Sequence, residues 1–468
     1  PDRLMHFLTL SSLRRFLKRT VIASCLAFTL PTFVFGQAAS GGAAAQQPPQ
    51  LSDRVSEELG KIRPHLDAQA WDQAIAIINN AMPGTPAGSY DEAILSQMKA
   101  QILLQKGDYK NSIPALEKTV QLGEAHNYFE KRVLLEYTFY LSQLYYQEAT
   151  TLKGADAQRP LMQKAITYIK QYLQGNPNPT QDARLFAASV LFAMGQLDPD
   201  NINQALIKEA YDEAQRGLRL AVKPNERFYL LSLAALQIMG RMQDSADLLE
   251  LLVTKEPKNS TYWQQLAATY LNLSGETKDE RQAYEYQVRA ILSIQRAQQN
   301  GVMNTPRDNF SLVGIYFNIQ QFDRAIALLE KGLRDGGIEN TQRNWELLAS
   351  SYQQLKREFK AIEALKEGMT HFPNAGGLDL QVANIYYSLD NLREALNFAL
   401  SALRKGNLDN PSQAQSFGAW AALELKEFDV AKQLAEEAAK DPKNRDATRL
   451  LEHIKTTIEE RNQALQSK

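Results

Sequence analysis

The residue types that most often carry catalysis or metal binding are scattered along this chain. No two histidines have the spacing that places a pair of metal ligands on one face of a helix. Paired carboxylates such as Glu436-Glu437 and Glu459-Glu460 lie in charged stretches, where a solvated helix face is the ordinary explanation. There is no glycine-rich phosphate loop, His-Glu-x-x-His motif or calcium loop. The sequence therefore predicts a protein that is not an enzyme and needs no metal or cofactor. The histidines are His6, His65, His126, His371 and His453.

A group of aromatic residues between positions 137 and 146 is the most unusual local composition. On a helix these side chains point to more than one side, as expected where a helix packs against both the preceding and the following helix. The alternative is an exposed patch that binds a partner, because tyrosine is enriched in protein interfaces. Both interpretations stay open at the level of sequence. The residues are Tyr137, Phe139, Tyr140, Tyr145 and Tyr146.

The elements that carry these residues repeat along the chain. Between Asn340 and Pro373 one apolar stripe marks a first helix and another marks a second helix. Small residues recur at intervals of 36, 34 and 36 positions. A period of about 34 residues with two helices per period indicates a stacked α-solenoid. The recurring small residues are Ala325, Ala361, Ala395 and Ala431.

The repeat predicts an all-α protein of about nine or ten helix hairpins. A hairpin this short cannot bury its apolar stripe alone, so each must stack on the next. We expect divergent pairs over residues 51–225 and a regular array over residues 226–442. Residues 443–468 are expected to cap the array, with a polar helix over Arg445–Gln466, because the last repeat of a solenoid needs a solvated outer face.

The spacing Trp345-x2-Leu348-Ala349-x2-Tyr352, followed by Ala361 and Pro373, resembles the tetratricopeptide repeat family. The fit covers about residues 55–442 and is strongest from 226 onward. The resemblance implies a right-handed superhelix whose concave groove holds a peptide or helix of a partner protein. The packing positions that carry it are Trp263, Tyr270, Tyr316, Ala325, Trp345, Tyr352, Ala361, Pro373, Tyr386, Ala395 and Ala431.

The same resemblance implies which side chains face the groove. They are the first-helix positions between the packing residues, and they combine hydrogen-bonding groups with one or two apolar anchors. Paired lysines and asparagines that would clamp a terminal carboxylate are absent from them, which disfavours a protein that recognises the carboxyl terminus of its partner. The predicted partner-binding residues are Arg343, Glu346, Ser350, Gln353, Gln354, Leu380, Asn384 and Tyr387.

The N-terminal residues predict export. Four cations, from Arg14 to Arg19, precede an apolar run from Val21 to Gly36, which is the pattern of a cleaved secretory signal. We expect the signal at residues 1–36, with translation starting at Met5, and a flexible leader rich in Ala, Gly, Gln and Pro at residues 37–50. An uncleaved inner-membrane anchor is the alternative. The single cysteine, Cys25, lies inside the signal, so the mature protein would contain no thiol.

Charge and a second resemblance narrow the functional class. The sequence has a net charge of −1. Residues 1–50 carry a net charge of +4, so the rest of the chain carries −1 − 4 = −5 and is mildly acidic. This balance argues against binding nucleic acid through phosphate contacts. The segments 307–316 and 344–349 also resemble proteobacterial tetratricopeptide proteins that are associated with TonB energy-transduction systems.

Three functional hypotheses follow. The first is a non-catalytic periplasmic scaffold that binds protein partners, within a TonB-type transport system or another envelope membrane complex. The second is an accessory protein of outer-membrane assembly or polysaccharide export. The third, a ligand-binding protein or enzyme, requires a convergent polar cluster that the sequence does not show. The sequence leaves the oligomeric state open.

Overall fold

A computed structural model describes residues 49–466, and every regular element among them is helical. The predicted signal (1–36) and most of the predicted leader (37–50) lie outside these residues. The chain divides into unit 1, which ends at Leu248, and unit 2, which begins at Leu249. The sequence boundary between 225 and 226, drawn on how regular the repeats are, stays a prediction. No helix within residues 49–466 is both long enough and apolar enough to cross a membrane.

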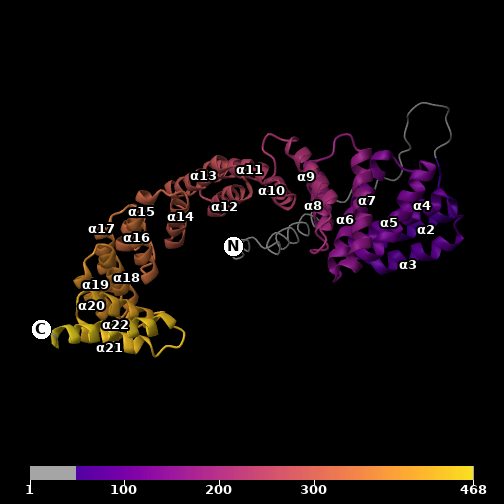
Figure 1. Cartoon of the computed structure of the whole chain (residues 1–468). Helices are drawn as coiled ribbons and strands as arrows, with labels where there is room; N and C mark the ends of the chain where they lie inside the picture. Colours follow the sequence, from indigo (N-terminus) through magenta and orange to yellow (C-terminus); the bar gives the residue numbers. More distant parts are fainter. Residues whose placement is uncertain (1–48, 467–468) are drawn as a thin grey trace. The chain divides into compact units, whose positions relative to one another are not determined.

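The helices follow one another in pairs along each unit (Figure 1). The α11 helix crosses the division between the units. The helices of unit 1 are α2 (Asp53–Asp67), α3 (Trp71–Ala81), the 3-10 turn η1 (Met82–Gly84), α4 (Tyr90–Lys106), α5 (Tyr109–His126), α6 (Lys131–Thr151), α7 (Ala155–Gly175), α8 (Gln181–Gly195), α9 (Gln204–Leu218), α10 (Arg227–Ile238) and α11 (Met242–Lys255). Those of unit 2 are α12 (Ser260–Glu276), α13 (Glu280–Gln299), α14 (Pro306–Asn318), α15 (Phe322–Asp335), α16 (Gln342–Gln354), α17 (Glu358–His371), α18 (Gly376–Ser388), α19 (Leu392–Lys405), α20 (Pro411–Glu424), α21 (Phe428–Ala438) and α22 (Arg445–Gln466).

The predicted fold class is confirmed. Within residues 49–466 the helices make ten successive pairs, and α22 follows the last pair as the expected terminal helix. Helices in contact are neighbours in the sequence, or next but one as in α8 with α10 and α20 with α22, which is the property of a solenoid. Each hairpin therefore buries its apolar stripe against the preceding and following hairpins, and no single central core is needed.

Packing within the hairpins follows the repeat. The indole rings of Trp263 and Trp345 are almost fully buried at the start of α12 and α16. Each indole N–H donates a hydrogen bond to the loop before its helix, to the Pro257 carbonyl at 2.8 Å and to Asn340 Oδ1 at 2.7 Å. The recurring alanines of the second helices are completely buried, which lets the paired backbones approach closely. They are Ala325, Ala361, Ala395 and Ala431.

The turn between the helices of a hairpin uses a left-handed residue. Glycine fills this position after α4, where Gly107 has φ 83°. Non-glycine residues occupy it in the regular hairpins of unit 2 and accept a conformation that L-residues seldom adopt. They are Gln320, Lys356, Asp390 and Lys426.

Successive hairpins are linked by tyrosine hydroxyls. In α16, Tyr352 donates a hydrogen bond of 2.6 Å to the Glu330 carboxylate on α15 of the preceding hairpin. The same pair of positions is bonded at four other junctions, at distances between 2.6 and 3.4 Å. These pairs are Tyr145 with Glu117, Tyr270 with Glu250, Tyr316 with Gln295 and Tyr386 with Lys366. At these five junctions the tyrosine of the first helix thus anchors its hairpin to the one before it.

The junction around Glu117 is the most densely bonded of these. Its carboxylate accepts hydrogen bonds from Tyr145 Oη at 2.6 Å, Tyr168 Oη at 2.8 Å and Lys164 Nζ at 3.0 Å. Burial by itself raises the pKa of Glu117, but these three donors outweigh it and hold the pKa below its ordinary value. Burial and the hydrogen bond to Glu117 raise the pKa of both tyrosines, so both hydroxyls keep their protons at physiological pH.

Replacing Glu117 with Gln is expected to remove an acid-sensitive part of the stability of unit 1. Because the folded pKa lies below the ordinary value of 4.5, the ionised carboxylate stabilises the folded state above pH 4.5. That contribution disappears as the pH falls through the folded pKa. Urea unfolding of the wild type and of Glu117→Gln between pH 7 and pH 3 should give different free energies of unfolding at neutral pH. This difference should become smaller as the pH falls. A difference that stays constant across this range would contradict the assignment.

Candidate functional site

The predicted partner-binding residues all lie on the solvent side of two first helices in unit 2. None of the eight is buried: Arg343, Gln353, Gln354, Asn384 and Tyr387 are exposed, and the other three are half-buried. Glu346 and Ser350 are on α16, and Leu380 is on α18. We call the surface formed by these eight residues the first-helix face. Its role in binding stays a prediction.

The two helices of this face adjoin each other. Gln342 Nε2 donates a hydrogen bond of 2.7 Å to Glu346 Oε1 on α16. A Cβ atom placed on Gly377, at the start of α18, would lie 3.1 Å from Gln342 Nε2 and 3.9 Å from Glu346 Oε1. The side chains of one hairpin therefore continue onto the next, and a ligand could contact both.

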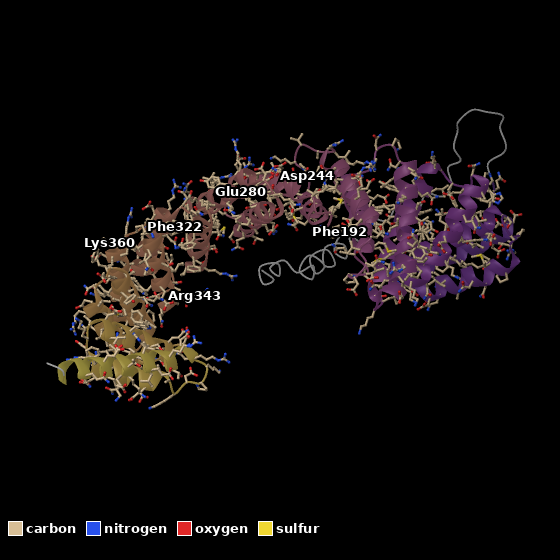
Figure 2. All side chains as sticks on the ribbon, viewed as in Figure 1. Phe192, Asp244, Glu280, Phe322, Arg343 and Lys360 are labelled. Carbon is tan, nitrogen blue, oxygen red and sulfur yellow. The ribbon has the colours of Figure 1, made fainter. Side chains whose placement is uncertain are left out.

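The first-helix face differs from the outer side of the second helices. Figure 2 shows Arg343 of α16 and Lys360 of α17 on opposite sides of the array. Lys360 pairs with Glu363 at 2.7 Å. Neighbouring charges of unit 2 are paired in the same way, in Arg334 with Glu367, Arg357 with Asp323 and Arg393 with Glu427. Arg343, by contrast, makes no ion pair within residues 49–466 and has its guanidinium available to a ligand.

Sequence reasoning missed exposed aromatic residues on the same side of the array. Trp420 of α20 is 42% exposed, and Phe310 of α14 is 38% exposed. Trp420 precedes Ala431 by the same interval that separates Ser350 from Ala361. Counting back from the recurring alanine would have found it. The hairpin was hard to align because α20 has Ala422 where α14, α16 and α18 have tyrosine.

The aromatic group at 137–146 belongs to the core of unit 1. Tyr137, Tyr145 and Tyr146 are each about 5% exposed, and Phe139 stacks on Tyr172 with ring centroids 4.9 Å apart. The packing interpretation is therefore the one that the structure supports. These rings join α6 to the helices on either side of it.

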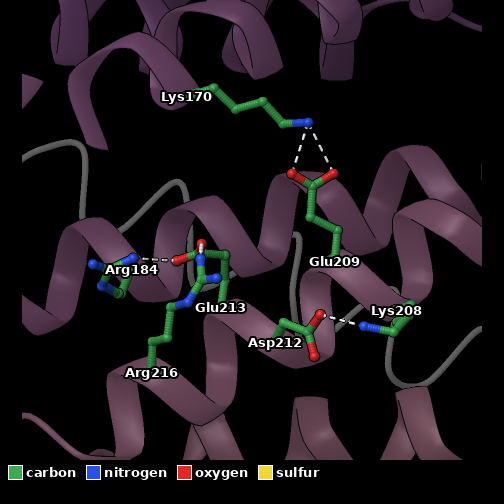
Figure 3. A network of polar contacts seen from close by, with 7 residues as sticks. All are labelled: Lys170, Arg184, Lys208, Glu209, Asp212, Glu213 and Arg216. Atoms are coloured by element: carbon green, nitrogen blue, oxygen red, sulfur yellow. Dashed lines mark hydrogen bonds and ion pairs between the residues drawn. The ribbon is translucent and has the colours of Figure 1, made fainter. Parts of the chain in front are cut away.

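The strongest charged cluster of unit 1 lies between α7, α8 and α9 (Figure 3). Glu213 of α9 is almost fully buried and pairs with Arg184 of α8 at 2.5 Å and with Arg216 of its own helix. Lys170 of α7 contacts Glu209 at 2.7 Å. Each carboxylate is neutralised by a cation of the same cluster, so the arrangement holds helices together and leaves no charge poised for catalysis.

No metal centre is formed by the part of the chain that the structure describes. In residues 49–466, no three histidine, cysteine or acidic side chains are grouped closely enough to bind an ion. His371, at the end of α17, stacks on the Trp345 ring at 5.6 Å between centroids. This histidine therefore has a packing role in its hairpin.

Comparison with known proteins supports the repeat. A family model described as tetratricopeptide repeat matches residues 93–126, which span most of α4 and all of α5. The match falls in the stretch where the sequence resemblance was weaker. No curated protein matches this sequence.

Several solved structures are similar to parts of the chain. A crystal structure of MamA is 17% identical, covers 36% of this chain and 91% of its own, and has a TM-score of 0.27. A structure from a study of pilF from Pseudomonas aeruginosa is 14% identical, covers 53% of this chain and 99% of its own, and has a TM-score of 0.29. The Cut9-Hcn1 hetero-tetramer of the APC/C is 12% identical, covers 86% and 90%, and has a TM-score of 0.26. These likenesses carry no conclusion about function. The hairpin packing and the matched repeat make the described part of the chain an α-solenoid of tetratricopeptide-type hairpins.

Proposed function

We propose that this protein is a non-catalytic scaffold of the periplasm that holds polypeptide partners on the first-helix face of unit 2, within a TonB-type energy-transducing system. The observation that carries the proposal is the exposure of that face. Five of its eight residues are exposed, and Arg343 makes no ion pair within residues 49–466. A surface that combines exposed amides, an aromatic ring and a free guanidinium suits recognition of another polypeptide.

The location and the transport system have separate support. The basic and apolar residues between Arg14 and Gly36 match an export signal. The two segments that resemble TonB-associated proteins, 307–316 and 344–349, coincide with α14 and α16, which are first helices of unit 2. The resemblance and the first-helix face thus have α16 in common.

Cross-linking in cells that produce the full-length protein tests the proposal. We expect the protein in the periplasmic fraction and expect it to cross-link to TonB-system components. Arg343→Glu should reduce that cross-linking severalfold, because it reverses the one positive charge among the eight residues of the first-helix face. Lys360→Glu is the matched control on the opposite side of the same hairpin and should leave it unchanged.

Other outcomes would redirect the proposal. Partition with the outer membrane and cross-linking to an export porin would favour a role in polysaccharide export or outer-membrane assembly. Recovery of the full-length protein in the cytoplasm would overturn the location. If Arg343→Glu and Lys360→Glu reduced cross-linking equally, the first-helix face would not be the surface that binds the partner.

A further inference from the structure

Four aromatic rings lie on the last two first helices of unit 2 and on the terminal helix α22. Tyr387 of α18 contacts Phe417 of α20 edge to face, with centroids 5.4 Å apart. Trp420 lies one turn after Phe417 and contacts His453 of α22 at 6.0 Å. We call these four residues the aromatic row. It extends the first-helix face beyond Tyr387 onto two further helices.

The rings of this row are held in place yet open to solvent. Tyr387 is 43% exposed and Trp420 is 42% exposed, while Phe417 between them is half-buried. Large rings fixed by their neighbours lose little conformational entropy on binding, and tyrosine and tryptophan dominate the energetics of protein interfaces. The row has the composition of a pair of binding anchors joined by a supporting ring.

The middle of the row, around Phe417, has uncharged neighbours on α18 and α20. Along α18 the exposed or half-buried neighbours are Leu380, Asn384 and Ser388, and along α20 they are Gln413 and Ser416. Charged side chains flank this part of the row: Glu424 lies one turn after Trp420, and Asp390 lies three residues after Tyr387. On α22, Arg449 lies one turn before His453. A charged group placed over Phe417, between the two exposed rings, would lose hydration without gaining a counter-charge, which is unfavourable. Amide and hydroxyl side chains can instead satisfy the backbone of a bound peptide.

We propose that the aromatic row binds an uncharged stretch of a partner polypeptide, whose aliphatic or aromatic side chains pack on Tyr387 and Trp420. Asn384 and Gln413 lie beside these anchors and hydrogen-bond to the backbone of that stretch. The inference rests on the proposed function and deepens it by assigning a chemistry to the partner. Any charge on the partner lies outside the stretch that contacts α18 and α20.

A selection from displayed random twelve-residue peptides against the full-length protein tests this assignment. We expect the recovered peptides to carry two or more large apolar residues and a net charge near zero. Their affinity, measured by calorimetry, should fall at least about tenfold for Trp420→Ala and for Tyr387→Ala, as for interface anchors in general. Tyr387→Phe retains the ring and should retain most of the binding.

Phe359→Ala is the matched control, because Phe359 is 68% exposed on α17, a second helix of the same unit. It should bind the peptides as the wild type does. Circular dichroism and melting of each variant separate loss of binding from loss of fold. Peptides rich in Asp and Glu or in Lys and Arg, no recovered peptide, or equal affinity in the alanine variants would each overturn the inference.

Two results separate this inference from the proposed function. Charged peptides whose binding depends on Arg343 but not on Trp420 would overturn the inference and leave the scaffold proposal intact. Peptides whose binding depends on no residue of the first-helix face would contradict both. Binding of chito-oligosaccharides in a Trp420-dependent manner would assign the row to glycans and also overturn the inference.

Discussion

Replacing Glu213 with Ala is expected to destabilise the α8–α9 hairpin by about 3 kcal/mol, because it leaves the buried Arg184 without a counter-charge. The Arg184 side chain is only 17% exposed, and its Nε is buried without a hydrogen bond. Hydrogen exchange of α8 and α9 is the appropriate measurement, since a solenoid of this length need not unfold in one transition. The loss should appear as faster exchange in these two helices.

Two variants make this prediction specific. Asp212→Ala removes a pair on the same helix whose partner, Lys208, is 67% exposed, and it should change the stability by no more than about 0.5 kcal/mol. The double variant Arg184→Met with Glu213→Leu should lose much less than Glu213→Ala, because no uncompensated charge remains. If the double variant were as unstable as the single one, desolvation of Arg184 would not be the cause.

This network also shows what sequence could not give. Glu213 and Arg216 are spaced as an ordinary surface pair, and nothing in the helical period distinguishes them from Lys208 and Asp212. The difference lies in burial by α8, which comes from a separate part of the chain. Sequence periodicity describes the stripe that one helix presents to its neighbours, but it does not show how completely a neighbour covers a given charge.

The fold itself was predictable because each hairpin repeats the same pattern of packing residues. The spacing of Trp345, Tyr352 and Ala361 fixes which sides of two helices pack together. The terminal helix at Arg445–Gln466 was found from its polar composition and occupies the same residues in the structure. The hydroxyl links between hairpins were not foreseen, because their partners, such as Glu330, lie on the preceding second helix and are polar residues outside the apolar pattern.

The candidate site was predictable only where the repeat was regular. On α16 and α18 the packing residues set the register, so the exposed positions could be counted. On α20 the small residues Gly418 and Ala422 replace the larger packing residues, and the register was lost together with Trp420. Counting from tryptophan or tyrosine therefore placed the exposed ring of Tyr387 on α18 but not that of Trp420 on α20.

The second large effect is expected for Gly376→Ala, at the first residue of α18. A Cβ atom there would lie 2.4 Å from the carbonyl oxygen of Ala402 and 2.4 Å from that of Gly406. Both are backbone atoms at the end of α19, so no side-chain rotation can relieve the contact. The Gly376 N–H also donates a hydrogen bond of 3.1 Å to Gly406, which the displacement would break. We expect a loss of about 1–3 kcal/mol in the α18–α19 hairpin, which overpacking of a tight contact typically costs.

Gly314→Ala is the control and is expected to raise the stability of its helix. Gly314 lies inside α14, and its added Cβ would meet nothing within 4 Å. Alanine at this position should stabilise the helix by about 0.5–1 kcal/mol, because glycine loses more backbone entropy on folding. Hydrogen exchange should therefore quicken in α18 and α19 for Gly376→Ala and slow in α14 for Gly314→Ala.

Because Leu380, Asn384 and Tyr387 all lie on α18, Gly376→Ala should also weaken peptide binding although no residue of the first-helix face is changed. If the exchange of α18 were unaltered in Gly376→Ala, the backbone at the end of α19 would have moved to accommodate the methyl group. The close approach of Gly376 to that backbone would then not be what positions α18.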